Sequence, residues 1–187
     1  MTERNRTRYN RTAIILHWGV ALTVFGLFAL GLWMVDLGYY DPWRKDAPEI
    51  HKAVGVLLFI AMSVRLVWRL LHPAPAPLAS HALWERRAAA ITHALLYSLL
   101  FATMVAGYLI STADGRAISV FGWFEVPATL SRLPNQEDIA GEVHFALAVT
   151  TLALVAAHAL AALKHHFFDR DPTLLRMLGR ATSSPET

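Results

Sequence analysis

The chain has 187 residues, of which 55% are hydrophobic and 17% are charged, and its formal net charge is +3. A mean hydropathy of +0.38 is too apolar for an ordinary soluble domain of this size and favours a small protein that crosses a membrane several times. Because the chain has no cysteine, disulfides, thiolate metal sites and the C-x-x-C-H attachment of haem are excluded.

Two apolar runs occupy the first half of the chain. The run 12–36 is longer than the apolar core of a cleavable signal peptide and has no small-residue cleavage site at its end. We therefore interpret it as a first membrane-spanning helix, with His17 near its start. The run 49–71 contains His51 near its start and Arg65 near its end, where a long side chain can reach the membrane interface. It predicts a second membrane-spanning helix.

Two further runs follow, 88–113 and 141–166, and each is long enough to cross a hydrocarbon layer of ~30 Å. The first has His93 near its start, and the second contains both His144 and His158. We therefore predict an all-α fold, a bundle of four transmembrane helices in a lipid bilayer.

The connections between these helices differ in length. The Pro-rich segment 72–80 stops the second helix, and His72 and His81 are predicted to be solvated in this loop. The longest connection, 114–140, contains the stretch ISVFGWFEVP. That stretch is apolar and aromatic enough to predict a short helix lying on the membrane surface.

Lysine and arginine are distributed unevenly between the two sides of the predicted bundle. Twelve of the seventeen fall on the side of the termini: Arg4, Arg6, Arg8, Arg11, Arg65, Arg69, Arg86, Arg87, Lys164, Arg170, Arg176 and Arg180. The positive-inside rule therefore predicts that both termini are cytoplasmic. The pI of about 9.5 then reflects membrane topology, and we expect no nucleic-acid partner. One domain is expected over 1–180, with a disordered tail over 181–187.

The histidines fall at two depths of this bundle. Because a helix rises ~1.5 Å per residue, His144 and His158 lie ~21 Å apart on one face of the fourth helix. His51 shares the periplasmic depth of His144, and His17 shares the cytoplasmic depth of His158. Two facing pairs of imidazoles are what two stacked b-type haems need as axial ligands. Hydrogen bonds between helices, a transition-metal site and a proton relay are the alternatives.

Two more residues lie at the depth of the inner pair. His93 can compete with His17 as the partner of His158, but we favour a role beside the haem rather than on its iron. Arg65 would be costly in lipid without a partner, and a propionate of the inner haem would supply one. The alternative is that Arg65 only marks the end of its helix.

Several separated stretches resemble the bacterial cytochrome b561 family of di-haem, four-helix membrane proteins, which includes superoxide oxidases. The stretches are ILHW, IHKAVG, VRLVWRLLHPAPAP, THALLY, GEVHFALA and HALAALKHHFFDRDPTLLRML. The resemblance implies that the four paired histidines are the iron ligands. It also implies that ubiquinone is received on the inner face around His93, His165 and the segment 169–171, where ring nitrogens can deliver protons.

The resemblance extends to the reaction. Iron with two histidine ligands has no open position for oxygen, so outer-sphere electron transfer remains. We expect an oxidoreductase of the bacterial inner membrane that passes electrons from superoxide to ubiquinone, with Lys52 attracting the anion. The alternatives are a haem-bearing anchor for a periplasmic dehydrogenase or hydrogenase, and a haem-free transporter or structural bundle.

Overall fold

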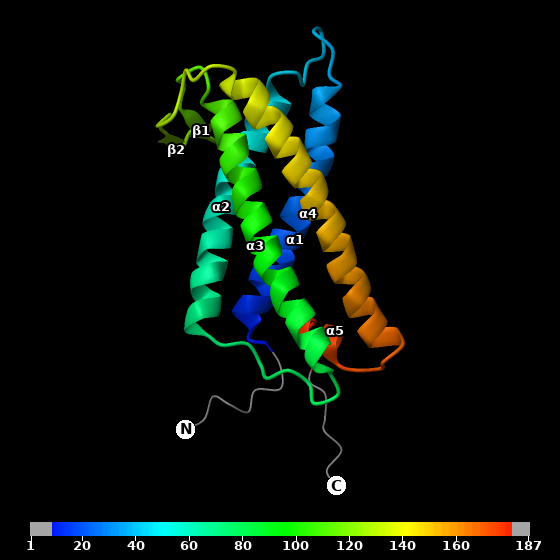
Figure 1. Ribbon diagram of the computed structural model, residues 1–187. Helices are drawn as coiled ribbons and strands as arrows, with labels where there is room; N and C mark the ends of the chain where they lie inside the picture. The colour runs from blue at the N-terminus through cyan, green and yellow to red at the C-terminus, as the bar shows by residue number, and fades with distance from the viewer. Residues whose placement is uncertain (1–8, 181–187) are drawn as a thin grey trace.

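The computed structural model describes residues 9–180, which form four long helices, a small hairpin and one short helix (Figure 1). The long helices are α1 (Arg11–Val35), α2 (Asp46–Leu71), α3 (Leu83–Ser111) and α4 (Gln136–Phe167). The remaining elements are β1 (Ile118–Val120), β2 (Phe124–Val126) and α5 (Thr173–Met177). All four long helices are long and apolar enough to cross a membrane, which confirms the predicted bundle.

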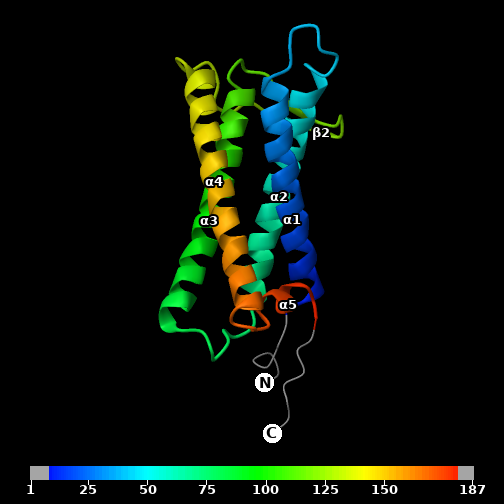
Figure 2. The same ribbon diagram turned by 90° about the vertical axis from the view of Figure 1, so that its right-hand side faces the viewer.

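The long helices run alternately up and down (Figures 1 and 2). α1 begins and α4 ends at one end of the bundle, which we call the proximal end; the hairpin lies at the other, distal end. α1 packs along α2, α3 packs along α4, and α2 joins the two pairs by packing against α3. That the proximal end is cytoplasmic stays a prediction. Part of its basis, Arg4, Arg6 and Arg8, lies outside the described residues, as does the tail 181–187.

Polar side chains fix where α1 and α3 begin. The side-chain oxygen of Asn10 accepts a hydrogen bond from Ala13 N at 2.8 Å and another from the Trp68 indole at 3.2 Å. This N-cap therefore ties the start of α1 to the end of α2. α3 begins at Leu83, earlier than the predicted 88, because the Glu85 carboxylate reaches back to the backbone N–H of the residue before the helix.

The longest connection forms a β-hairpin, so the prediction of a surface helix was wrong. Trp123 N donates to Val120 O at 2.9 Å and closes the turn between the antiparallel strands. Phe121 and Gly122 have φ of 51° and 73°, two successive left-handed residues as in the turns that suit a hairpin's twist. Ile118 and Val120 alternate with an exposed residue and are buried, with β1 packed against α2.

A buried apolar cluster fills the middle of the bundle between α1, α2 and α3. Its centre is Val20, Leu58 and Met62, surrounded by Val24, Leu27, Ala61, Tyr97, Leu100, Phe101 and Met104. On α2 this cluster falls between His51 and Arg65. It therefore separates a distal level of polar groups from a proximal one.

Candidate functional site: two facing histidine pairs

Four histidine rings meet in two pairs inside the bundle. At the proximal level, the ring centroids of His17 on α1 and His158 on α4 lie 6.3 Å apart. At the distal level, those of His51 on α2 and His144 on α4 lie 6.2 Å apart. The ring planes cross at 70° and 71° respectively. The structure thus brings together the same partners that helix depth predicts.

These separations suit two ligands on opposite sides of one metal ion. With metal–imidazole bonds of about 2 Å and ring centres about 1.1 Å behind the nitrogens, coaxial ligands have centroids about 6.2 Å apart. The ring of His93 lies at 5.2 Å from that of His158, which is too close for such an arrangement. The geometry therefore favours His17 over His93 as the partner of His158.

The distal rings carry a further mark of ligand histidines. His144 Nδ1 lies 2.9 Å from the carbonyl oxygen of Thr103, so Nδ1 donates its N–H and Nε2 keeps a free lone pair. Metal-ligating histidines are usually oriented in this way. On the facing ring, His51 Nδ1 is buried and has no hydrogen-bond partner within residues 9–180. The distal pair therefore has ring nitrogens that make no hydrogen bond and are available to bind a metal ion.

Two glycines give the distal rings room. A Cβ at Gly107 of α3 would lie 3.0 Å from His144 Cε1, and a Cβ at Gly31 of α1 would lie 3.3 Å from His51 Cε1. Any side chain at either position would press on a histidine ring. Neither glycine can be recognised from the sequence, because only the packing of α1 and α3 against their neighbours reveals their role.

The proximal pair is surrounded by cationic and aromatic side chains. Arg65 Nη2 lies 2.9 Å from His17 Nδ1, and the guanidinium carbons of Arg65 and Arg69 each lie 5.8 Å from the Tyr97 ring centre. To accept this hydrogen bond, Nδ1 of His17 must be unprotonated, which leaves the proton on Nε2. Coordination of a metal through Nε2 of His17 would therefore require Arg65 to break this hydrogen bond. That Arg65 pairs with a propionate of the inner haem stays a prediction.

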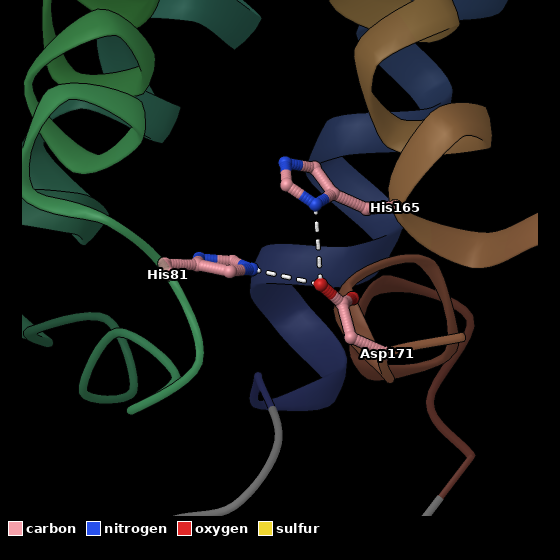
Figure 3. Close-up of side chains that lie close together, drawn as sticks. All are labelled: His81, His165 and Asp171. Atoms are coloured by element: carbon pink, nitrogen blue, oxygen red, sulfur yellow. Dashed lines mark hydrogen bonds and ion pairs between the residues drawn. The ribbon is translucent and has the colours of Figure 1, made fainter. Parts of the chain in front are cut away.

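A second group of polar residues lies at the proximal end, outside the bundle core. His81 Nε2 lies 2.8 Å and His165 Nδ1 lies 3.2 Å from the same oxygen, Asp171 Oδ2 (Figure 3). The side chain of His81 is only 16% exposed, so the prediction that it is solvated was wrong. The ring of His72 also packs against the protein, because it stacks on the ring of Trp68 with centroids 3.9 Å apart.

The two carboxylates beside His165 have lowered pKa values. A hydrogen bond from the Lys164 ammonium is the main cause for the pKa of Asp169. Burial acts to raise the pKa of Asp171, but hydrogen bonds from Thr173 and His81 outweigh it, and the pKa lies below the ordinary 3.8. Both groups are therefore carboxylates at neutral pH.

Two of the cationic side chains at the distal end, Lys52 and Arg44, already have partners within the protein. Lys52 Nζ pairs with Glu49 Oε1, one helical turn away on α2. Arg44 donates to the carbonyl oxygen of Leu37 at 3.0 Å, and its guanidinium lies 6.0 Å from the Tyr39 ring centre. Any attraction of an anion to His51 must therefore work against the charge of Glu49.

Comparisons with known proteins agree with this architecture. A family model described as prokaryotic cytochrome b561 matches residues 8–180. The chain is 52% identical to "Cytochrome b561 homolog 2" of Escherichia coli (strain K12), over 94% of each chain. It is 30% identical to "Cytochrome b561 homolog 1" of the same organism, over 92% of this chain and 98% of the relative. It is 28% identical to "Probable superoxide oxidase CybB" of Yersinia pestis, over 91% of this chain and 96% of the relative.

Proposed function

Because the chain belongs to the prokaryotic cytochrome b561 family of electron-transfer proteins, which bind haem b through histidines, we propose that it holds two haems b. His51 and His144 would hold one haem at the distal level, and His17 and His158 the other at the proximal level. The observation that carries this proposal is the common centroid separation of the two ring pairs, 6.2 and 6.3 Å.

Haem held by two imidazoles supplies single-electron transfer and leaves no open position on the iron for oxygen. The protein's own part is to orient the rings. The carbonyl oxygen of Thr103 keeps His144 in the ligand tautomer, and Gly31 and Gly107 leave space for the distal rings. The apolar cluster around Met62 keeps water away from the region between the two levels.

The reaction we propose is superoxide:ubiquinone oxidoreduction across the bacterial inner membrane. At the distal, periplasmic end, two superoxide ions each lose one electron and leave as O₂. At the proximal, cytoplasmic end, ubiquinone gains two electrons and two protons and becomes ubiquinol. Support for superoxide comes from the relative in Yersinia pestis, whose name gives that substrate.

The proximal end offers suitable groups for a quinone. A surface pocket of about 360 Å³ is lined by His166, Arg170, Asp171, Pro172 and Leu175. It adjoins His165 through Asp171, while His93 stands beside His158 deeper in the bundle. In the proposed reaction His165 and His93 pass protons toward the quinone oxygens, because the ring nitrogens of imidazole can both donate and accept a proton.

The test is to expose purified, haem-loaded protein to an enzymatic superoxide source in detergent with a ubiquinone analogue. We expect the haem absorbance to show reduction and ubiquinol to accumulate at one molecule per two superoxide ions. Addition of superoxide dismutase should abolish both signals. If superoxide leaves the haems oxidised, although dithionite reduces them, the proposed donor is wrong.

An electron-transfer anchor is the second candidate, and one surface feature favours it. The distal loops expose large aromatic side chains, with Tyr39 79%, Tyr40 94% and Trp123 74% exposed. A partner dehydrogenase or hydrogenase could dock there, close to the distal histidine pair. Copurification of a redox-active partner from native membranes, together with failure to react with superoxide alone, would favour this function.

A further inference from the structure

Three side chains from separate parts of the chain converge at the proximal end, and Figure 3 shows their arrangement. His81 comes from the loop after α2, His165 from the last turn of α4, and Asp171 from the segment between α4 and α5. Their ligand atoms all lie within 4.8 Å of one another. We propose that His81 Nε2, His165 Nδ1 and Asp171 Oδ2 form a binding site for a divalent transition-metal ion such as Zn²⁺.

The donor set suits this class of ion. Two imidazoles and one carboxylate form a ligand set that Zn²⁺ takes in sites with three protein ligands and a fourth, open position. The histidine nitrogens lie 2.8 and 3.2 Å from Asp171 Oδ2. Ligands bound at about 2 Å in a tetrahedral arrangement stand about 3.3 Å apart, which is close to these two separations, and the two ring nitrogens lie within 4.8 Å of each other.

The surroundings orient the carboxylate for this task. Thr173 N donates to the other carboxylate oxygen, Asp171 Oδ1, at 2.8 Å, which leaves Oδ2 facing both rings. Asp171 N in turn donates to the carbonyl oxygen of His165 at 3.0 Å and fixes the two ligand residues relative to each other. Such outer contacts hold metal ligands in place in known sites. The Asp171 side chain is 8% exposed, so water competes little for it.

The local charge also favours a cation. Asp169 Oδ2 lies 2.8 Å from His165 Nδ1, and Glu85 lies beyond it. Lys164 contacts both, at 2.7 Å to Asp169 and 3.4 Å to Glu85. Lys164 thus contacts two of the three carboxylates, while Asp171 faces the two rings, and a divalent ion between the rings would balance the charge of Asp171 when the imidazoles are neutral.

The site shares His165 and Asp171 with the proposed quinone face, so binding is measured without quinone or superoxide. Haem-loaded protein is stripped with a chelator, dialysed against Zn²⁺, and assayed for zinc per chain. We expect one zinc per chain. His81→Asn and Asp171→Asn should each weaken binding by about tenfold or more, as changes around metal sites commonly do. His72→Asn, a substitution in the same loop outside the cluster, should leave it unchanged.

X-ray absorption at the zinc edge of the unmodified protein gives a second readout that needs no variant. The expected spectrum has two imidazole ligands per zinc. Zinc binding that survives both cluster substitutions, a spectrum with no imidazole, or no zinc above the His81→Asn level would overturn the proposal. None of these results bears on electron transfer, so the proposed function stands or falls separately.

Discussion

Gly107 of α3 lies directly against His144 of α4, so that a Cβ at position 107 would stand 3.0 Å from Cε1 and 3.1 Å from Nδ1 of the ring. The same ring is held on its Nδ1 side by the carbonyl oxygen of Thr103, one turn earlier on α3. α3 therefore contributes no histidine to the distal pair but sets the position of one of its rings.

This contact predicts that Gly107→Ala disturbs the distal haem. Overpacking of a close contact typically costs about 1–3 kcal/mol, here by tilting the ring from its Thr103 contact. We expect lower occupancy or a shifted reduction potential of one haem, measured by pyridine haemochrome assay and redox titration. Gly141→Ala is the matched control, because a Cβ there meets nothing within 4 Å. Equal haem occupancy and equal reduction potentials in the two variants would contradict the role of Gly107 in positioning the His144 ring.

The ligand assignment predicts separate losses at the two levels. His144→Ala should lose the distal haem and His158→Ala the proximal one, because each removes one of two axial ligands. Haem per chain should fall from two to one in each variant, while His72→Ala should keep two. If both ligand variants retain two low-spin haems, the assignment is wrong.

His93 should act on the quinone reaction and not on haem binding. Its ring lies 5.2 Å from that of His158 but in a position unsuited to the opposite side of one ion. We expect His93→Ala to keep both haems and to slow their oxidation by a ubiquinone analogue several-fold in stopped-flow measurements. Loss of a haem would instead make His93 a ligand, and unchanged kinetics would remove it from the proton route.

Charge at the distal end should govern the reaction with superoxide. Lys52→Glu places a second negative charge beside Glu49 and should lower the rate of haem reduction several-fold at low salt. Glu49→Gln frees the Lys52 charge and should raise that rate. Both effects should fade as ionic strength rises, since the Debye length shortens from ~10 Å at 0.1 M to ~3 Å at 1 M. Rates that ignore both substitutions and salt would rule out electrostatic steering.

Acid should weaken the attachment of the α5 segment. The pKa of Asp171 is lowered from 3.8 in the folded protein, so its ionised form stabilises the fold at neutral pH, and this contribution is lost as pH falls below 3.8. Asp171→Asn should lower the melting temperature at pH 7 by about 2–4 °C, equivalent to about 1 kcal/mol. The difference should shrink as the pH is lowered below 3.8, as followed by circular dichroism. Exposed Asp36→Asn should change little at either pH.

The spans were predictable because a membrane helix must satisfy its backbone internally and be apolar over its whole length. Three charge-free runs and one run that is apolar over most of its length therefore revealed the four helices and the depths of His17, His51, His144 and His158. Their ends were less predictable. α4 begins at Gln136, before the predicted 141, because the Gln136 amide donates to the carbonyl oxygens of Leu109 and Leu130. Such contacts depend on how α3 and its following loop return to the bundle.

The hairpin and the group formed by His81, His165 and Asp171 were not predictable for a related reason. The stretch around Phe121 and Gly122 is apolar enough for either a surface helix or two strands, and only the left-handed turn decides between them. His81 and Asp171 are 90 residues apart in sequence. A histidine in a Pro-rich loop carries no local sign that its ring will be buried against the segment after α4.

The two histidine pairs stand at different positions in the electric field of an energised membrane. His144 and His158 are ~21 Å apart along α4, about two-thirds of a ~30 Å hydrocarbon layer. With the proximal end cytoplasmic, an electron moving between the two levels travels toward the negative side. A voltage of ~100 mV would then oppose that movement by about 1.5 kcal/mol. Electron transfer through this protein would therefore slow in energised vesicles and recover with an uncoupler, which would make it responsive to respiration itself.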